Sequence, residues 1–295
     1  MLSILIPVYN YDVRPLVFEL HKQCTASTIE FEIVVQDDAS EIFINENNSI
    51  TNLNFCSYNV LQKNCGRSVV RNTLVQLAKF DNLLFLDADT MPVSAIFISS
   101  YINQITIEEK IVYGGIVYQT SKPENSKLLR WVYGKKREAL SVTKRNAEPY
   151  LSFLTLNFLI KKSVFTKVKF NENIPNLRHE DTLFSFDLMK NKIKIGHIDN
   201  PIVHLGLDLN TNFIIKSEKA IDNLHYLINK KLIDYQYVKL AKTAIYVKKS
   251  NMQFLVSKIF TVAKPLLLKN LIGKKPSLLL FDFYRLGYFC QINND

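Results

Sequence analysis

The sequence predicts an α/β fold built on an open sheet, largely parallel, with helices on both faces. Two observations predict it. Apolar runs of strand length alternate along the chain with segments whose apolar residues recur at helical spacing. The composition, 47% hydrophobic and 12% aromatic over 295 residues, is that of a globular protein with a sizeable core. The chain is therefore long enough for one large domain with an appendage.

The first half of the chain carries the clearest alternation. Strands are predicted over residues 2–8, 31–35, 55–60 and 83–86, and helices over residues 12–24 and 67–79. The helix over 67–79 has Val70, Leu74 and Leu77 on one face. Strands separated by helices in this way favour parallel pairing.

The second half changes from a mixed pattern to a helical one. We expect strands over 111–117, 150–160 and 193–198, and helices over 163–168 and 179–190. Beyond about residue 215 the pattern is helical. Its clearest feature is an apolar stripe at helical spacing, formed by Met252, Leu255, Val256, Ile259, Phe260 and Ala263.

The net charge of +10 is concentrated in the last 80 residues. Residues 1–215 hold 23 Lys and Arg against 22 Asp and Glu, whereas residues 216–295 hold 14 against 5. The first residues show no basic segment or small-residue cleavage site, so we expect no secretory signal. Four scattered cysteines without a CxxC pair are typical of reduced thiols, not of a zinc site or a disulfide framework.

Two carboxylates, Asp87 and Asp89, directly follow the apolar run Leu83–Leu86. Ligands of such folds bind at the carboxyl ends of strands, and two neighbouring carboxylates suit Mg²⁺ or Mn²⁺ that holds a phosphate. A turn that ends the strand with two solvated acids is the alternative, because Asp is a common turn residue. The DxD motif by itself leaves both interpretations open.

Three acidic sites lie at or beside predicted strand ends, namely Asp37/Asp38, Asp87/Asp89 and Glu180/Asp181. A nucleotide needs a carboxylate that accepts from the base or ribose, and a diphosphate needs a bound metal. Displacement at a sugar carbon needs a further carboxylate that takes the proton of the acceptor. The chain offers one candidate for each task, which favours a sugar-transfer site over three structural turns.

These motifs resemble family 2 glycosyltransferases with the GT-A fold. The resemblance covers roughly residues 1–205, with the motifs in the family's order. It is carried by residues 3–10 (SILIPVYN), 37–40 (DDAS), 64–66 with Arg71 and Asn72, 85–89 (FLDAD) and 179–181 (HED). Ala39 stands where the family usually has Gly. The resemblance implies inverting transfer from a nucleotide-diphosphate sugar, with Mn²⁺ or Mg²⁺ as cofactor.

The resemblance also implies a donor site. Pro7 and Tyr9 would line the nucleobase, Asp38 would contact the base or ribose, and Asp37 would support Asp38. Arg71 would approach the nucleotide from its helix.

The same resemblance implies which residues would bind the metal. Asp89 would be the principal metal ligand, and Asp87 would bind the ribose or join the metal shell. His204 would be an additional metal ligand, as in some family members, although a structural histidine is the alternative.

Catalysis is assigned to the Glu180-Asp181 pair on the same basis. Asp181 would be the general base, and Glu180 would orient the acceptor hydroxyl. Thr155 and Asn157 match a region that usually shapes the pocket for the donor sugar and the acceptor. The resemblance thus assigns a role to each of the three acidic sites.

We therefore expect a GT-A catalytic domain over 1–210, with a nucleotide-sugar half (about 1–110) and an acceptor half (about 111–210), and a basic helical extension over 211–295. The expected activity is transfer from a UDP-sugar to a hydroxyl of a glycan or lipid-linked acceptor in cell-surface polysaccharide synthesis. Two alternatives are a sugar-nucleotidyltransferase, although the first strand is not followed by a Gly-rich phosphate loop, and a catalytically inactive nucleotide-sugar-binding protein.

The basic extension predicts a second kind of partner. Its apolar runs are shorter than the roughly 20 residues of a spanning helix, so we expect no transmembrane span. A basic amphipathic segment can lie on an anionic membrane, and packing against the catalytic domain is the alternative. No nucleic-acid-binding module accompanies the lysines, so nucleic acid is not expected. The expected location is the cytoplasm, peripheral to the inner face of the membrane.

Overall fold

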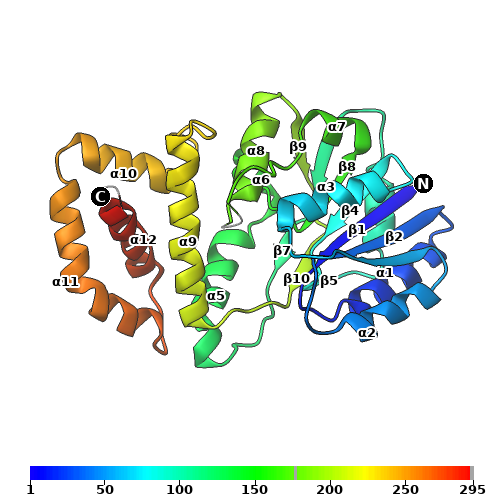
Figure 1. Cartoon of the computed structure of the whole chain (residues 1–295), viewed down its shortest axis with the longest axis horizontal. Helices are drawn as coiled ribbons and strands as arrows, with labels where there is room; N and C mark the ends of the chain where they lie inside the picture. The colour runs from blue at the N-terminus through cyan, green and yellow to red at the C-terminus, as the bar shows by residue number, and fades with distance from the viewer. Residues whose placement is uncertain (176–177, 293–295) are drawn as a thin grey trace. The chain divides into compact units, whose positions relative to one another are not determined.

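The computed structural model describes residues 1–175 and 178–292. Within it the chain divides into two compact units (Figure 1). Unit 1 comprises Met1–Tyr118, Ala139–Asn173 and Glu180–Gly206, and unit 2 comprises Gln119–Glu138, Ile174–His179 and Leu207–Asp295. The last three residues of the predicted extension, 293–295, lie outside the described part of the chain.

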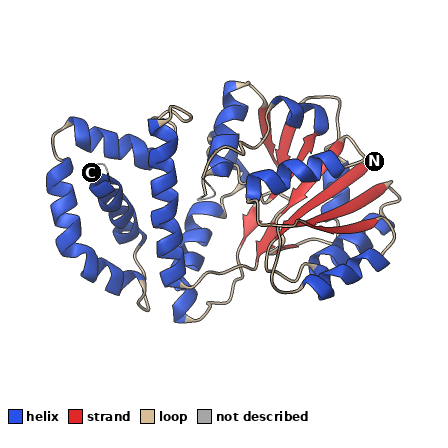
Figure 2. Cartoon of the chain, in the orientation of Figure 1, coloured by secondary structure: helices blue, strands red, loops and turns tan. Residues whose placement is uncertain are grey.

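Unit 1 is built on a mixed seven-stranded sheet, as expected for an open α/β fold (Figure 2). Its strands, in spatial order, are β3 (Cys56–Val60), β2 (Phe31–Asp37), β1 (Leu2–Val8), β4 (Asn82–Leu86), β8 (Asn157–Lys161), β6 (Lys110–Tyr113) and β9 (Lys194–His197). The first four are parallel, and β8 runs antiparallel to both β4 and β6. A small second sheet has the order β5 (Thr90–Pro92), β10 (Ile202–His204) and β7 (Ile116–Val117).

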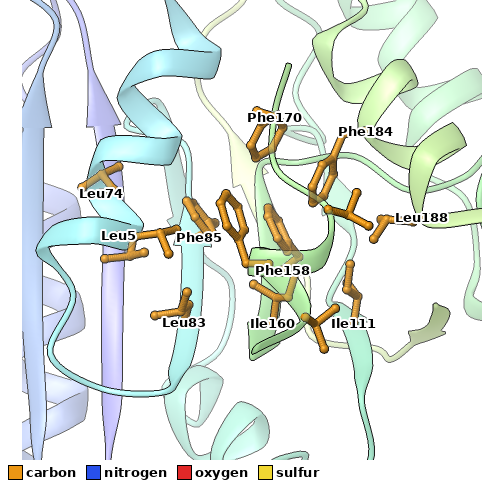
Figure 3. Close-up of a cluster of buried hydrophobic side chains, with 14 of the residues drawn as sticks. Leu5, Leu74, Leu83, Phe85, Ile111, Phe158, Ile160, Phe170, Phe184 and Leu188 are labelled. Atoms are coloured by element: carbon orange, nitrogen blue, oxygen red, sulfur yellow. The ribbon is translucent and has the colours of Figure 1, made fainter. Parts of the chain in front are cut away.

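The helices of unit 1 lie between its strands along the chain, and the longer ones bury an apolar face. They are α1 (Arg14–Ala26), α2 (Ile44–Asn48), α3 (Arg67–Leu77), α4 (Phe97–Ile102), α6 (Val142–Ala147), α7 (Lys162–Lys167) and α8 (Glu180–Lys190). Residues from α3, α7 and α8 share one core with alternate residues of the strands (Figure 3). Phe85 and Phe158 stack at 4.8 Å between β4 and β8, and Phe170 and Phe184 stack at 4.2 Å.

Two predicted strands are shorter than expected. The segment 111–117 is divided into β6 and β7 by Gly114 and Gly115, and Gly115 has a left-handed φ of +101° that a strand does not accommodate. The segment 150–160 is a strand only from Asn157 onward. Before it, turn-type bonds such as Ser152 N to Glu148 O satisfy the backbone locally, so no ladder forms.

Unit 2 is helical. It contains α5 (Leu128–Tyr133), α9 (Asn210–Asn229), α10 (Lys239–Lys249), α11 (Gln253–Leu271) and α12 (Leu278–Ile292), and α12 packs against α9, α10 and α11 (Figure 1). Across the described residues, none of these helices combines the length and apolar character needed to cross a bilayer. Residues 119–138 belong to this unit, although no pattern in the sequence indicates that they pack with the C-terminal helices.

Removal of a buried side chain at the centre of the unit 1 sheet should strongly lower the stability of the protein. Phe158→Ala removes a fully buried ring that stacks on Phe85, so we expect a loss of about 3–5 kcal/mol in the free energy of unfolding. Chemical denaturation measures it. Phe18→Ala on α1, whose side chain is half exposed, is the control and should cost less than about 1 kcal/mol. Equal losses in the two variants would contradict this account of the core.

Candidate active site

The strand order predicts a ligand-binding position at the carboxyl ends of β1 and β4. From β1 the chain adds β2 and β3 on one side and β4 on the other, which makes this pair the switch point of the sheet, where ligands bind in open α/β folds. Pairing of β1 with β4 ends at Leu5, two residues before Pro7. Proline has no N–H to donate, and at Pro7 β1 pairs only with β2, because its pairing with β4 has already stopped. The predicted nucleobase residues Pro7 and Tyr9 therefore lie at this position, with Tyr9 half exposed.

Asp37 and Asp38 end β2 and bind the turns around them. Asp37 is fully buried, and its oxygens accept from Ser40 N at 2.7 Å and Tyr58 Oη at 2.6 Å. These bonds hold the turn beside Asp38, and the predicted role of Asp37 in supporting a ligand contact of Asp38 stays a prediction. Ala39, directly after Asp38, has a left-handed φ of +59°, a conformation that glycine adopts without strain.

Asp38 joins the end of β2 to the start of α3. Its carboxylate accepts from the backbone N–H groups of Cys65 at 2.6 Å and Gly66 at 2.9 Å, directly before the helix begins at Arg67. Burial raises the pKa of Asp38, while these two bonds act in the opposite direction. Each carboxylate oxygen has a second lone pair, so the group can still accept from a ligand.

Arg71 links two of the three acidic sites. It is buried on α3, and its Nη2 lies 2.8 Å from Asp87 Oδ1 while its Nη1 lies 3.7 Å from Glu180 Oε1. Arg67, one turn earlier on the same helix, approaches the same Glu180 oxygen at 3.2 Å. The predicted metal-binding segment after β4 and the predicted base segment at the start of α8 therefore belong to one site.

The two carboxyl groups of Glu180 and Asp181 have opposite electrostatic environments. Burial by itself would raise the pKa of Glu180, but the guanidinium groups of Arg67 and Arg71 outweigh it and hold that pKa below its usual value. Burial and the neighbouring Glu180 charge raise the pKa of Asp181 to about 6. A carboxyl group poised near neutral pH suits a general base.

Asp89 and His204 meet on the small sheet. Residue pairing of β10 with β5 sets His204 opposite Thr90, and His204 Nε2 lies 3.5 Å from Asp89 Oδ2. The backbone carbonyl of Asp89 also accepts from Leu205 N. A Cβ on Gly206 would lie 2.0 Å from Asp89 Oδ2, so only glycine leaves room for this carboxylate.

The predicted metal set is partly assembled. Asp89 and His204 converge, whereas Asp87 bonds to Arg71 instead of joining them. In the described ranges no three His, Cys, Asp or Glu side chains are arranged to hold a metal by themselves. A carboxylate and an imidazole fit Mn²⁺ as two protein ligands, with diphosphate oxygens completing the shell. His204 Nδ1 is buried without a hydrogen-bond partner in the described structure.

Thr155 and Asn157 lie beside β4 in different ways. Thr155 is buried in the turn whose next residue, Leu156, accepts from Asp87 N. The amide of Asn157 is fully used inside the protein. Its Nδ2 donates to Gly115 O and Asn200 O, and its Oδ1 accepts from Tyr101 Oη at 2.7 Å. Asn157 thus holds the break between β6 and β7, and its predicted contact with the donor sugar stays a prediction.

Sequence reasoning missed three residues of the site. Arg67 lies four residues before Arg71 and therefore on the same face of the helix. This spacing could have indicated that Arg67 belongs to the site. Gly206 contacts Asp89 across 117 positions of sequence, which no local pattern reveals. Tyr11 follows β1, and burial, then the charges of Asp89 and Asp12, raise its pKa, which marks it as a neighbour of Asp89.

Comparison with known proteins assigns the fold. The family model described as Glycosyl transferase family 2 matches residues 3–170. No curated protein matches the sequence. The fold is that of GT-A glycosyltransferases, represented by mannosyltransferase PcManGT from Pyrobaculum calidifontis in complex with GDP-Man and Mn²⁺, with a TM-score of 0.57. That alignment has 13% identity and covers 100% of this chain and 88% of the other.

Two structures of S. aureus TarS are also similar. Residues 1–349 of TarS in complex with UDP-GlcNAc align at a TM-score of 0.50 and 16% identity, covering 97% of this chain and 90% of the other. A second TarS structure aligns at a TM-score of 0.48 and 19% identity over 75% of this chain. The chain spans 39% of that second structure. At these identities the likeness concerns the fold.

The hydrogen bonds of Asn157 predict a structural effect of its removal. Asn157→Ala leaves two buried carbonyl groups and the Tyr101 hydroxyl with fewer partners, so we expect a loss of about 2–3 kcal/mol in unfolding free energy. Thermal and urea unfolding measure it. Asn59→Ala, at an exposed position on β3, is the control and should cost less than about 0.5 kcal/mol. If Asn157→Ala kept wild-type stability, this anchoring role would be wrong.

Proposed function

The chain belongs to glycosyl transferase family 2, and on that premise we propose that it catalyses inverting transfer of a sugar from a nucleoside diphosphate sugar to an acceptor hydroxyl. The observation that carries the proposal is the position of Arg71 between Asp87 and Glu180. This one side chain ties the segment proposed to hold the leaving diphosphate to the segment proposed to activate the acceptor. Both parts of a single displacement therefore have candidates within one site.

Asp181 is the proposed general base. The acceptor oxygen attacks the anomeric carbon on the face opposite the diphosphate, and the bond from that carbon to the diphosphate oxygen breaks. The hydroxyl proton passes to the Asp181 carboxylate, and the nucleoside diphosphate leaves with the electron pair. A pKa near 6 supports this role, because the carboxylate is ionised at neutral pH and still basic enough to accept a proton.

Glu180 is proposed to orient the acceptor and to tune the base. Arg67 and Arg71 keep it ionised, and its negative charge next to Asp181 raises the pKa of that group. Without the two arginines the site would hold two adjacent carboxylates that repel each other.

The donor is proposed to bind with its nucleotide at the carboxyl ends of β1 and β2. Tyr9 and Pro7 would line the base, and Asp38, fixed by Cys65 and Gly66 N–H groups, would accept from the base or ribose. Asp37 would hold that turn in place. Thr155 and Asn157 would shape the far side of the pocket, near the donor sugar and the acceptor. We propose a UDP-sugar as donor.

Asp89 and His204 are the residues proposed to hold Mn²⁺ or Mg²⁺, with Asp87 at the edge of the shell or on the ribose. The bound ion would offset the negative charge that develops on the leaving diphosphate. Arg71, buried and with Nε lacking a hydrogen-bond partner among the described residues, adds positive charge on the same side.

The acceptor is proposed to be a glycan or lipid-linked hydroxyl in cell-surface polysaccharide synthesis. The enzyme would then work in the cytoplasm, peripheral to the inner face of the membrane. The excess of lysine in the last 80 residues supports contact with an anionic surface.

Replacing the proposed base separates catalysis from donor binding. Asp181→Asn should lower transfer and slow donor hydrolysis by about 10²–10⁴-fold, because no carboxylate remains to take the acceptor proton. The assay is release of UDP or GDP from a panel of nucleotide sugars, with Mn²⁺ and with chelator. Titration calorimetry should give wild-type affinity for the nucleotide.

The matched control is Asp187→Asn on the same helix α8, which should keep wild-type turnover. Near-wild-type turnover by Asp181→Asn would withdraw the base assignment. If no nucleotide sugar of the panel bound or was turned over by the wild type, the proposed function itself would be wrong.

The pH profile offers an independent test of the Glu180-Asp181 pair. Activity requires ionised Asp181, so turnover should rise with pH through an apparent pKa near 6. Glu180→Gln removes the charge that raises this pKa and leaves Arg67 and Arg71 to attract Asp181, so the inflection should move to lower pH. An unchanged or higher inflection in Glu180→Gln would show that another group titrates.

A further inference from the structure

Helix α11 is apolar on two opposite faces. Its inner face packs within unit 2 through residues that are buried, namely Gln253, Ser257, Phe260, Leu267 and Leu271. The predicted stripe on this helix is therefore not the packing face. Of its members, Phe260 is buried, whereas Met252, Leu255 and Ile259 are about half exposed.

The outer face of α11 carries what we call the apolar ridge, formed by Leu255, Ile259, Val262 and Leu266. These residues recur at i, i+4, i+7 and i+11, so they lie in one line along the helix. Val262 is 81% exposed and Leu266 is 72% exposed. Large apolar residues that gather on an exposed face mark interaction sites more often than single exposed ones do.

The ridge does not hold the fold of unit 2. Phe260, on the inner face, packs its ring against Tyr284 of α12 at 5.2 Å, and a Cβ on Gly287 would meet Phe260 at 2.5 Å. These contacts attach α11 to α12 independently of the ridge. Polar substitutions on the ridge should therefore leave unit 2 folded.

Positive charge surrounds the ridge. Residues 235–281 contain nine lysines and no Asp or Glu. Lys258 and Lys269 lie three or four residues from ridge members, on the same side of the helix, and Lys258 Nζ lies 4.5 Å from the Phe254 ring. Within the described residues Lys264 pairs with Glu218, whereas Lys258, Lys269 and Lys274 form no ion pair.

We propose that the outer face of α11 docks on an anionic phospholipid bilayer. The ridge and Phe254 would enter the boundary between headgroups and acyl chains, and Lys258 and Lys269 would remain at the level of the lipid phosphates. Each lysine near an anionic surface adds attraction that falls with salt. This docking deepens the peripheral-membrane part of the proposed function and requires no sugar transfer.

Charge favours lipid over a second copy of the chain as the occupant. Two α11 ridges in contact would bring lysines of both copies together in a stretch that offers no carboxylate to neutralise them. An anionic headgroup layer supplies the missing negative charge along the whole face.

The test is co-sedimentation of the full chain with phosphatidylcholine vesicles, with and without phosphatidylglycerol, at low and high salt. The wild type should bind only the anionic vesicles and dissociate as salt rises. The ridge variant Leu255→Ser/Val262→Ser/Leu266→Ser should lower the partition coefficient about tenfold or more. Lys258→Gln/Lys269→Gln should weaken binding and flatten the salt dependence.

A matched control carries three serine substitutions at exposed apolar positions of unit 1, Phe55, Ile96 and Ile107, and should bind as the wild type does. Val262→Trp adds a probe whose emission should shift to the blue with anionic vesicles. Circular dichroism should show that all variants remain folded.

Three outcomes would overturn the docking proposal. They are no binding of the wild type at low salt, equal binding by the ridge variant, or self-association that the ridge variant abolishes in the absence of lipid. Donor hydrolysis without vesicles is measured in parallel and should be the same in the ridge variant and the wild type. Failure of hydrolysis with intact vesicle binding refutes the sugar-transfer proposal alone, and the reverse result refutes the docking alone.

Discussion

The candidate site depends on the buried ion pairs of Arg71. A guanidinium group with almost no solvent access is stable only when carboxylates surround it, and Asp87 and Glu180 do so from segments more than 90 residues apart. Arg67 adds a second positive charge at Glu180. The two arginines also make the acidic pair unequal, because they lower the pKa of Glu180, whereas burial and the Glu180 charge raise the pKa of Asp181. Packing and acid–base chemistry thus have a common electrostatic cause.

The sheet brings these groups together by its order of strands. Pairing between β1 and β4 stops early, and the loops after β1, β2 and β4 then meet at one edge. Hydrogen bonds of Asp37 and Asp38 hold the turn after β2 and the start of α3, and those of Asn157 hold the break between β6 and β7. Several residues that are predicted to contact a ligand therefore also hold the turns around the candidate site in position.

The helices of unit 2 differ from those of unit 1 in how their apolar residues are distributed. Its inner faces are buried in the usual way, around α12, yet α11 also leaves large apolar residues exposed between unpaired lysines. Hydropathy along the sequence finds the apolar residues of this helix but not which of its faces packs, because both faces are apolar. That choice is made by the shape of α12, where Gly287 admits the Phe260 ring.

The sequence by itself determined the main strands and helices of the large sheet, the fold class and the family, because periodicity and strand-end motifs are local properties. It also anticipated that Asp89 and His204 would be close. It did not indicate the short elements α2, α4, α6, β5 and β10. Tertiary structure alone decided that Asp87 faces Arg71 and that Gly206 leaves room for Asp89. It also divided one predicted strand, shortened another at its start and exposed half of the predicted stripe. These outcomes depend on contacts between distant segments, which no local period encodes.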